Sequence, residues 1–201
     1  MIHYKIFKPG AFEVYYGSMK SGKTKALLDR VEQLTYTNHN VLVFKPEVDT
    51  RDGFLKSRNS ANEYSCIYVN ERLPESIFDH VKENTSVVAI DEIQFFSKNI
   101  AQVVEALQRR NINIIAAGLN TDFRGEPFGA MGHLLALANE SYALAGVCDV
   151  SNCNMVATRT QRLIDGKPAQ YDSPIILIEG SGKEVYETRC LHHHDVPGKP
   201  E

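Results

Sequence analysis

The sequence of 201 residues has no tryptophan, only four cysteines and no run of eighteen uncharged apolar residues. Without such a run, no helix long enough to span a bilayer is expected, and we expect no membrane partner. The N-terminal stretch has no long apolar segment after a basic start, which predicts no signal peptide and a cytoplasmic location. Four cysteines in a reducing compartment are more typical of metal ligands or core residues than of disulfides.

The sequence also lacks an excess of positive charge, because its net charge is −3. A broad nucleic-acid-binding face needs clustered basic residues, so no nucleic-acid partner is expected. The charge does not argue against a nucleotide, since a single loop can bind phosphate locally. The length suits one ordinary domain with a small appendage.

Strand-like and helix-like segments alternate through the first part of the chain, which predicts an α/β fold with a parallel sheet flanked by helices. The expected strands are residues 12–17, 41–46, 64–69, 86–92 and 112–119, and the expected helices are residues 22–37, 74–84 and 100–111. After about Tyr142 the pattern changes to cysteines, short strand-like runs and turn residues. We therefore expect a nucleotide-binding domain over residues 1–141 and a small lobe over residues 142–201.

Residues 17–24, GSMKSGKT, match the phosphate-loop pattern G-x-x-x-x-G-K-[ST] and lie between an expected strand and an expected helix. Glycines allow the backbone N–H groups to curve around an anion, and the helix N-terminus adds partial positive charge. Lys23 is expected on the β- and γ-phosphates, and the Thr24 hydroxyl on Mg²⁺. The expected ATP-binding residues are Gly17, Ser18, Met19, Lys20, Ser21, Gly22, Lys23 and Thr24. The fold is then a P-loop, RecA-like sheet.

Two carboxylates, Asp91 and Glu92, end the apolar strand VVAI. Ligands of such sheets bind at the carboxyl ends of the strands, where an aspartate holds Mg²⁺. Because adjacent residues on a strand point apart, Glu92 is free for another role. It can deprotonate water, as in an ATPase, or an alcohol, as in a kinase, and the motif does not separate these.

The loop AAGLNTDFRGEPFG, residues 116–129, follows the next expected strand and contains Phe123 and Phe128 among glycines and a proline. Exposed aromatic side chains at the carboxyl edge of the sheet can stack on a flat apolar ligand such as a base. The alternative is a loop folded on its own aromatic side chains.

The motifs GSMKSGKT, DEIQFF, GLNTDFRGEPFG and TQRL occur in the order and spacing of the thymidine kinase family shared by many bacteria, poxviruses and the animal cytosol. The resemblance extends from the first strand to Cys190 or His193. The loop 116–129 resembles the family's lasso, which closes over the nucleoside and holds its base. The resemblance implies phosphorylation of thymidine by ATP, feedback inhibition by dTTP and a homotetramer.

The resemblance also implies roles for individual residues. Glu92 is similar to the base that takes the 5′-hydroxyl proton, and Arg51 to an arginine near the transferred phosphate. Asp91 is similar to the aspartate that holds magnesium through water, together with Thr24. The positions similar to those of the thymidine pocket are Met19, Phe95, Leu119, Phe123, Phe128, Thr160, Arg162 and Tyr186.

Lys20 departs from many relatives, which have phenylalanine or asparagine at this position. Its ammonium group either adds charge beside the triphosphate or points to solvent, and we expect solvent.

Residues 157–180 are expected to form a hairpin with a turn at IDGKPA. On its second strand Ile175 and Leu177 alternate, and their shared face either closes the nucleoside pocket or belongs to the core of the lobe.

The cysteines of the lobe resemble the ligands of the family's structural zinc. Cys148 and Cys153 would form one pair and Cys190 and His193 the other, giving a closed tetrahedral Cys₃His site. The first pair departs from C-x-x-C, because four residues separate the cysteines. His192 or His194 can replace His193, and we expect Cys66 in the core.

Two other classes of protein share parts of these motifs. The first is a P-loop motor, because DEIQ resembles a helicase box, but 201 residues leave little room for a second motor domain. The second is a zinc-ribbon nucleic-acid module, against which the acidic balance counts. ATP turnover that is stimulated by a nucleoside indicates a kinase, and ATP turnover that is stimulated by DNA indicates a motor. DNA binding without ATP turnover indicates a nucleic-acid module.

Overall fold

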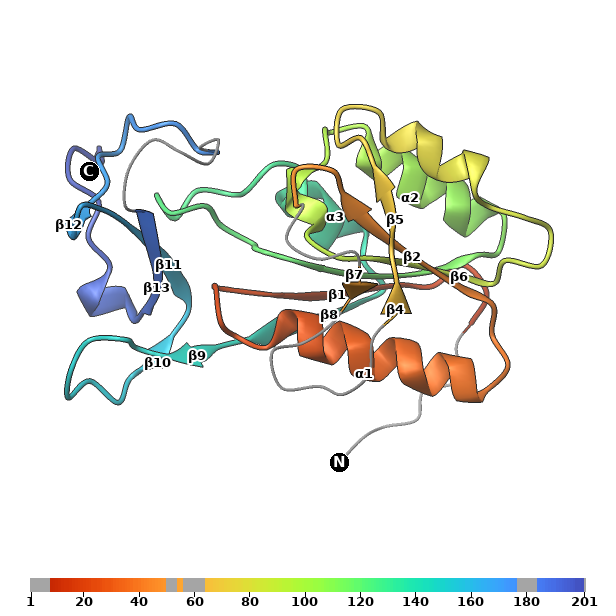
Figure 1. Ribbon diagram of the computed structural model, residues 1–201, viewed down its shortest axis with the longest axis horizontal. Coiled ribbons are helices and arrows are strands. Elements are labelled where there is room, and N and C mark those ends of the chain that lie inside the picture. The colour runs from red at the N-terminus through yellow and green to blue at the C-terminus, as the bar shows by residue number, and fades with distance from the viewer. Residues whose placement is uncertain (1–7, 50–53, 56–63, 177–183, 201) are drawn as a thin grey trace.

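A computed structural model of the chain describes residues 8–49, 54–55, 64–176 and 184–200. Arg51 and Leu177, which the sequence places in the site, lie outside these ranges. Figure 1 shows a sheet covered by helices on both faces and a smaller lobe, built from the C-terminal part of the chain, at one end of that sheet.

The central sheet contains six strands in the order β5-β2-β6-β7-β1-β8. Its strands are β1 (Phe12–Gly17), β2 (Val41–Pro46), β5 (Ile67–Val69), β6 (Val87–Ile90), β7 (Asn113–Gly118) and β8 (Glu140–Leu144). All neighbouring strands are parallel. β6 and β7 are buried at every position, as expected for strands covered on both faces. The predicted parallel α/β fold is therefore confirmed.

Helices cover both faces of this sheet (Figure 1). The helices are α1 (Lys23–Tyr36), α2 (Ile100–Arg109) and α3 (Met131–Leu137). Leu27 of α1 belongs to the same buried cluster as Ile115, whereas Leu107 of α2 belongs with Ile114 to the cluster on the other face. Successive side chains of a strand point to opposite faces, so these adjacent isoleucines of β7 contact the two helical layers.

The segment between β5 and β6 differs from the helix predicted over residues 74–84. It forms only a 3₁₀ turn, η1 (Pro74–Asp79). The Ser76 and His80 N–H groups bond carbonyls three residues earlier, and the Ser76 hydroxyl also donates to the Leu73 carbonyl at 2.8 Å. Hydrogen bonds to carbonyls three residues earlier define a 3₁₀ rather than an α-helical turn. A second 3₁₀ turn, η2 (Ile93–Phe95), follows β6.

The strand predicted over residues 64–69 is split. β4 (Tyr64–Ser65) pairs antiparallel with β3 (Phe54–Leu55), while β5 joins the central sheet beside β2. Cys66, expected in the core, lies between β4 and β5 and is only partly buried, packed against the core cluster that contains Leu27.

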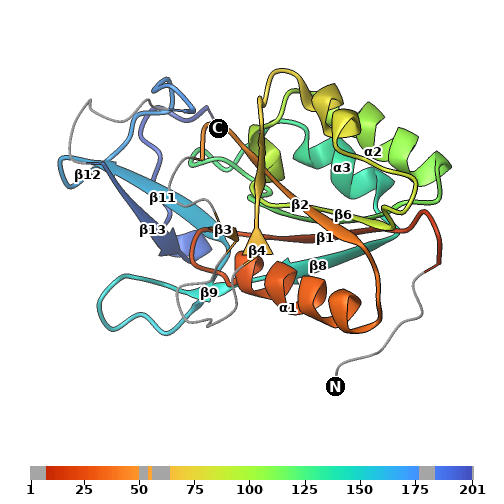
Figure 2. The same cartoon turned by 45° about the vertical axis from the view of Figure 1, so that its right-hand side comes forward.

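The small lobe begins directly after β8 (Figure 2). Its elements are β9 (Gly146–Val147), β10 (Val156–Ala157), β11 (Arg159–Ile164), β12 (Lys167–Pro168), β13 (Glu184–Arg189) and the 3₁₀ turn η3 (Leu191–His193). β8 pairs with β1 up to Leu144, so the central sheet extends across the expected boundary between residues 141 and 142. The boundary itself stays a prediction.

The hairpin predicted in this lobe is correct at its turn but wrong in its second strand. β12 follows the turn as expected but ends at Pro168, which has no N–H group to donate to a ladder. β13 instead pairs along the whole of β11. Ile175 lies in a bend and is 40% exposed.

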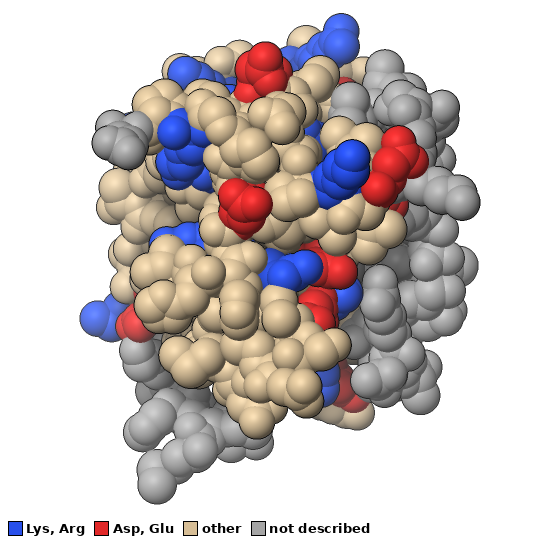
Figure 3. Space-filling model, turned by 90° about the vertical axis from the view of Figure 1, so that its left-hand side faces the viewer, with Lys and Arg blue, Asp and Glu red and all other residues tan. Residues whose placement is uncertain are grey.

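None of the helices in the described part of the chain has the length and apolar character to cross a bilayer. Figure 3 views the end of the molecule formed by the small lobe, where basic and acidic side chains lie interspersed among uncharged ones.

Candidate active site

The phosphate-loop sequence lies between β1 and α1, as its motif requires. Lys23 is 8% exposed, and its Nζ donates to the Ser18 carbonyl at 2.7 Å, so the side chain folds back over the loop. Burial lowers the pKa of Lys23, while Glu92 and Asp91 oppose that change. The lysine is therefore buried next to two carboxylates. A bound anionic phosphate would offset the free-energy cost of burying the charge of the lysine.

The two ends of the loop differ in the space around their glycines. A Cβ on Gly17 would lie 2.0 Å from the Leu144 carbonyl oxygen of β8. Gly22 has φ of +87° and no atom within 4 Å of a built Cβ. The first position therefore requires glycine for a close backbone approach, and the second for its left-handed backbone.

Asp91 lies just beyond the end of β6 and is 3% exposed. Its Oδ1 is 3.5 Å from the Thr24 hydroxyl, and its Oδ2 is 3.8 Å from the Lys45 Nζ. Burial raises the pKa of Asp91 to about 7, the nearby Glu92 adds to the rise, and Lys45 opposes it. A buried carboxylate and a threonine hydroxyl at this distance match the oxygen ligands that Mg²⁺ takes in proteins.

A buried ion pair beside Asp91 was missed from the sequence. Lys45, at the end of β2, donates to Asp49 at 3.1 Å, and both side chains are less than 10% exposed. Burial opposes the charge of Lys45, but Asp91 and Asp49 outweigh it and raise the pKa of the lysine. The signal in the sequence is a lysine at the end of an apolar strand with an aspartate four residues later.

Glu92 is the first residue after Asp91, and the two carboxylates have different neighbours. Both lie beyond the strand, rather than on it as expected, and Glu92 has a left-handed backbone with φ of 51°. The Gln94 Nε2 donates to the Glu92 carboxylate at 2.6 Å, and the Gln94 Oε1 accepts from the Leu119 N–H at 3.0 Å. Gln94, which sequence reasoning missed, therefore joins Glu92 to the loop after β7.

Both phenylalanines of the loop after β7 are buried against other elements, Phe128 against η2 and Phe123 against β11, so neither of the two alternatives describes the loop in full. Phe123 is 3% and Phe128 8% exposed. Phe128 packs edge-on against Phe95 with ring centroids 5.5 Å apart, and a bridge joins Thr121 to Pro127. These contacts place the loop beside η2 and Glu92, at the carboxyl edge of the sheet.

Arg162 of β11 is fully buried and lies over the Phe123 ring, 3.7 Å from its centroid. Its Nη1 donates to the Pro174 carbonyl at 2.6 Å. Its Nε and Nη2 have no hydrogen-bond partner among the described residues. Tyr186 of β13 pairs with Arg162 across the two strands, so these two expected pocket residues are neighbours.

The phosphate loop contacts the small lobe. The Met19 N–H donates to the Thr160 hydroxyl at 3.1 Å, which brings together two residues expected in the thymidine pocket. Lys20 is not directed only to solvent, because its Nζ lies 2.8 Å from the Asp149 carboxylate in a partly exposed ion pair. Neither of the two alternatives considered for Lys20 describes this contact.

The expected metal ligands come together in the lobe. Ligand atoms of Cys148, Cys153, Cys190 and His193 all lie within 4.8 Å of one another. The Cys153 and Cys190 sulfurs are 4.0 Å apart, close to the ~3.8 Å that two sulfurs have in a tetrahedral site with bonds of about 2.3 Å. The group could hold a metal ion such as zinc.

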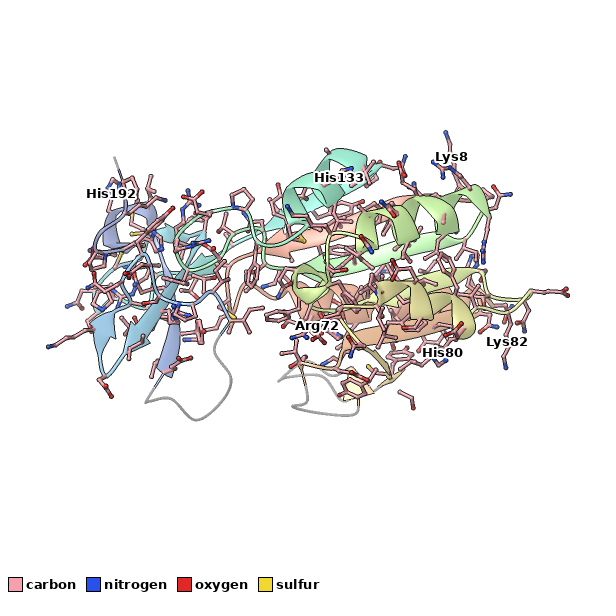
Figure 4. The ribbon with its side chains drawn as sticks, turned by 90° about the horizontal axis from the view of Figure 1, so that it is seen from above. Lys8, Arg72, His80, Lys82, His133 and His192 are labelled. Carbon is pink, nitrogen blue, oxygen red and sulfur yellow. The ribbon has the colours of Figure 1, made fainter. Side chains whose placement is uncertain are left out.

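Of the three consecutive histidines, His193 is the one that belongs to this cluster. His193 Nδ1 is 3.4 Å from the Cys190 sulfur, whereas His194 donates to the Phe123 carbonyl at 2.8 Å. Figure 4 shows His192 at the outer end of the lobe, opposite the end of the molecule that carries Lys8.

The thiol of Cys148 is suited to ligation. Burial disfavours its thiolate, but hydrogen bonds from the backbone of Cys190 and Val150 outweigh it and lower the pKa of Cys148 to about 6. The thiolate is the form that binds metals. The wide spacing to Cys153 is accommodated by Asn152, whose φ of 63° turns the chain between the two cysteines.

A phosphate loop before α1, with acidic residues at the end of β6, defines an α/β protein of the P-loop class. The family model for thymidine kinase matches residues 10–194. The match covers nearly the whole chain, which therefore belongs to the thymidine kinase family. Membership implies a nucleoside kinase, a transferase whose substrates are ATP and thymidine.

Proposed function

We propose that this protein transfers the γ-phosphate of ATP to the 5′-hydroxyl of thymidine, giving dTMP and ADP in pyrimidine nucleoside salvage, with deoxyuridine as a further possible substrate. The observation that carries the proposal is the position of Glu92 next to both the phosphate loop and the aromatic loop after β7. Its hydrogen bond to Gln94, which bonds Leu119, orients the carboxylate between the two ligand sites.

In this proposal each group at the sheet edge has a separate role. Lys23 binds the β- and γ-phosphates, and the loop N–H groups hold the rest of the triphosphate. Thr24 and Asp91 hold the magnesium ion that accompanies ATP, which would neutralise charge on the transferred phosphoryl group. Glu92 accepts the proton of the 5′-hydroxyl as the phosphoryl group leaves ADP. Arg51, outside the described residues, would add positive charge near that group.

The nucleoside would lie against the aromatic loop and the lobe. Phe95 and Phe128 form one apolar wall, and Thr160 and Tyr186 lie on neighbouring lobe strands. Arg162 is proposed as a further pocket residue because two of its nitrogens lack partners among the described residues. The resemblance also supports a homotetramer, inhibition by dTTP, a structural zinc in the Cys₃His group and a cytoplasmic location.

The test is release of ADP from ATP and Mg²⁺, with and without thymidine, by wild type and Glu92→Gln. We expect release that requires thymidine and falls by about 10²–10⁴-fold in the variant, because the amide cannot accept the proton. Glu83→Gln, which changes an exposed glutamate before β6, serves as the matched control and should retain wild-type turnover. ADP release that is indifferent to thymidine would contradict the proposal and favour a DNA-dependent ATPase.

A further inference from the structure

The ion pair between Lys20 and Asp149 joins the phosphate loop to the small lobe, and it does so at a residue with an unusual backbone conformation. Lys20 has φ of 58°, in the left-handed region that non-glycine residues rarely adopt. A residue keeps such a backbone only where its surroundings hold it. The Lys20 Nζ lies 2.8 Å from Asp149, so one such restraint comes from the lobe, 129 residues later in the chain.

Two further hydrogen bonds, through Thr188, also link Asp149 to the phosphate loop. The same carboxylate oxygen, Oδ2, accepts from the Thr188 N–H at 2.8 Å. The Thr188 hydroxyl in turn donates to the Met19 carbonyl at 2.7 Å. Asp149 therefore closes a ring of contacts that begins at Met19 and ends at Lys20, two consecutive residues of the phosphate loop.

Two neighbouring residues of the phosphate loop, Ser18 and Met19, are also hydrogen-bonded to the lobe. The Ser18 hydroxyl donates to the Ala157 carbonyl at 3.3 Å, and the Met19 N–H donates to the Thr160 hydroxyl at 3.1 Å. Both backbone polar groups of Met19 are thus bonded to hydroxyls of the lobe. These bonds fix the backbone immediately before the peptide groups that a phosphate loop of this kind turns toward its anion.

We propose that Asp149 is a positioning residue for nucleotide binding, which through Lys20 and Thr188 holds the phosphate loop in the conformation that receives the triphosphate. The inference rests on the proposed function, since it takes the loop to bind ATP. When a binding-competent conformation is only partly populated, the apparent affinity falls by that fraction. Loss of Asp149 should therefore weaken ATP binding without altering the chemical step.

The test measures binding of Mg²⁺ and a fluorescent, non-hydrolysable ATP analogue to the full chain, without thymidine. The variants are Asp149→Asn, which loses the ion pair but keeps an acceptor for the Thr188 N–H, Asp149→Ala, which loses both, and Lys20→Met. Lys25→Met is the matched control, because it removes a lysine from an exposed ion pair with Asp29 on α1.

We expect Asp149→Asn and Lys20→Met to weaken binding about two- to fivefold, the size expected for a partly exposed ion pair. Asp149→Ala should weaken it about tenfold, because the Thr188 N–H also loses its acceptor. Lys20→Arg, which keeps the ion pair, should bind more tightly than Lys20→Met. In turnover, the Asp149→Asn variant should show a higher KM for ATP at unchanged kcat.

A double-mutant cycle separates positioning from a general loss of stability. If Lys20 and Asp149 act through each other, the double variant Lys20→Met/Asp149→Asn is no weaker in ATP binding than the worse single variant. A lower melting temperature with unchanged ATP affinity would assign Asp149 a merely structural role and overturn the inference. Tighter binding in Asp149→Asn would overturn it too, because the freed Lys20 would then be a direct phosphate ligand.

The outcomes for wild type distinguish this inference from the function on which it rests. Wild type that does not bind the ATP analogue contradicts both. Wild type that binds it, together with an unaffected Asp149→Ala variant, contradicts the positioning role alone and leaves the kinase proposal standing.

Discussion

Replacing Asp91 by asparagine should make the protein more stable in alkaline solution, although Asp91 is a proposed magnesium ligand. The carboxyl is 3% exposed, and its pKa rises from an ordinary 3.8 to about 7, chiefly through burial. A group whose folded pKa is raised contributes stability in its protonated form. That contribution is complete below pH 3.8 and is lost as the pH rises through about 7.

The magnitude follows from these two values. Each pH unit between the folded and unfolded pKa is worth about 1.4 kcal/mol. Between pH 5 and pH 8.5 the wild type should lose about 2–3 kcal/mol of unfolding free energy through Asp91. Asparagine has no charge to bury, and Lys45 keeps Asp49 as a partner at 3.1 Å. The stability of Asp91→Asn relative to wild type should therefore rise by about 2–3 kcal/mol between these pH values.

Urea unfolding of both proteins at pH 5 and pH 8.5, without nucleotide or magnesium, measures this difference. Asp29→Asn changes an exposed aspartate and should stay within about 0.5 kcal/mol of wild type at both pH values. A relative stability of Asp91→Asn that is constant, or falls with pH, would refute the assignment of a costly buried charge to Asp91.

Two further predictions concern the lobe and the phosphate loop. For the proposed structural metal, a chelator should lower the melting temperature by about 10 °C, the shift for about 3 kcal/mol in a chain of this length, and Cys190→Ser should do the same. Cys66→Ser, outside the Cys₃His group, should leave the chelator effect intact; an unchanged melting curve after chelation would contradict a structural metal. Gly17→Ala should cost about 2–3 kcal/mol and at least tenfold in ATP affinity, because its Cβ would lie 2.0 Å from the Leu144 carbonyl. Gly22→Ala meets no atom within 4 Å and should cost only about 1 kcal/mol in backbone strain; equal effects of the two changes would argue against the close approach of β8.

The central sheet could be predicted because the apolar runs in the sequence coincide with strands that are buried in the fold. The strands over residues 12–17 and 41–46 have the predicted bounds, since each is an apolar run next to glycine or proline. The turn at Pro74–Asp79 could not be predicted as 3₁₀, because its apolar spacing suits a helix equally well. Apolar spacing does not encode whether the Ser76 and His80 N–H groups bond carbonyls three or four residues earlier.

The site was predictable where the residues are close in sequence and not where they are distant. The loop and the pair Asp91–Glu92 follow from motifs. The burial of Phe123 depends on Arg162, 39 positions later, and the ion pair of Lys20 on Asp149, 129 positions later. No local pattern records such partners. Lys45 was missed for a related reason, because a lysine ending a strand is usually solvated.

The contacts that complete the phosphate loop have a consequence for biosynthesis. Met19 is made early, but its hydroxyl partner Thr188 follows 169 residues later. A chain still being translated can form β1 and α1 from local contacts, yet it cannot close the loop until the lobe has left the ribosome. Because contacts between distant residues form late and slowly, ATP should bind more tightly to a chain that includes the lobe than to a shorter nascent chain. A truncation product ending before Thr188 would then compete less well for cellular nucleotide.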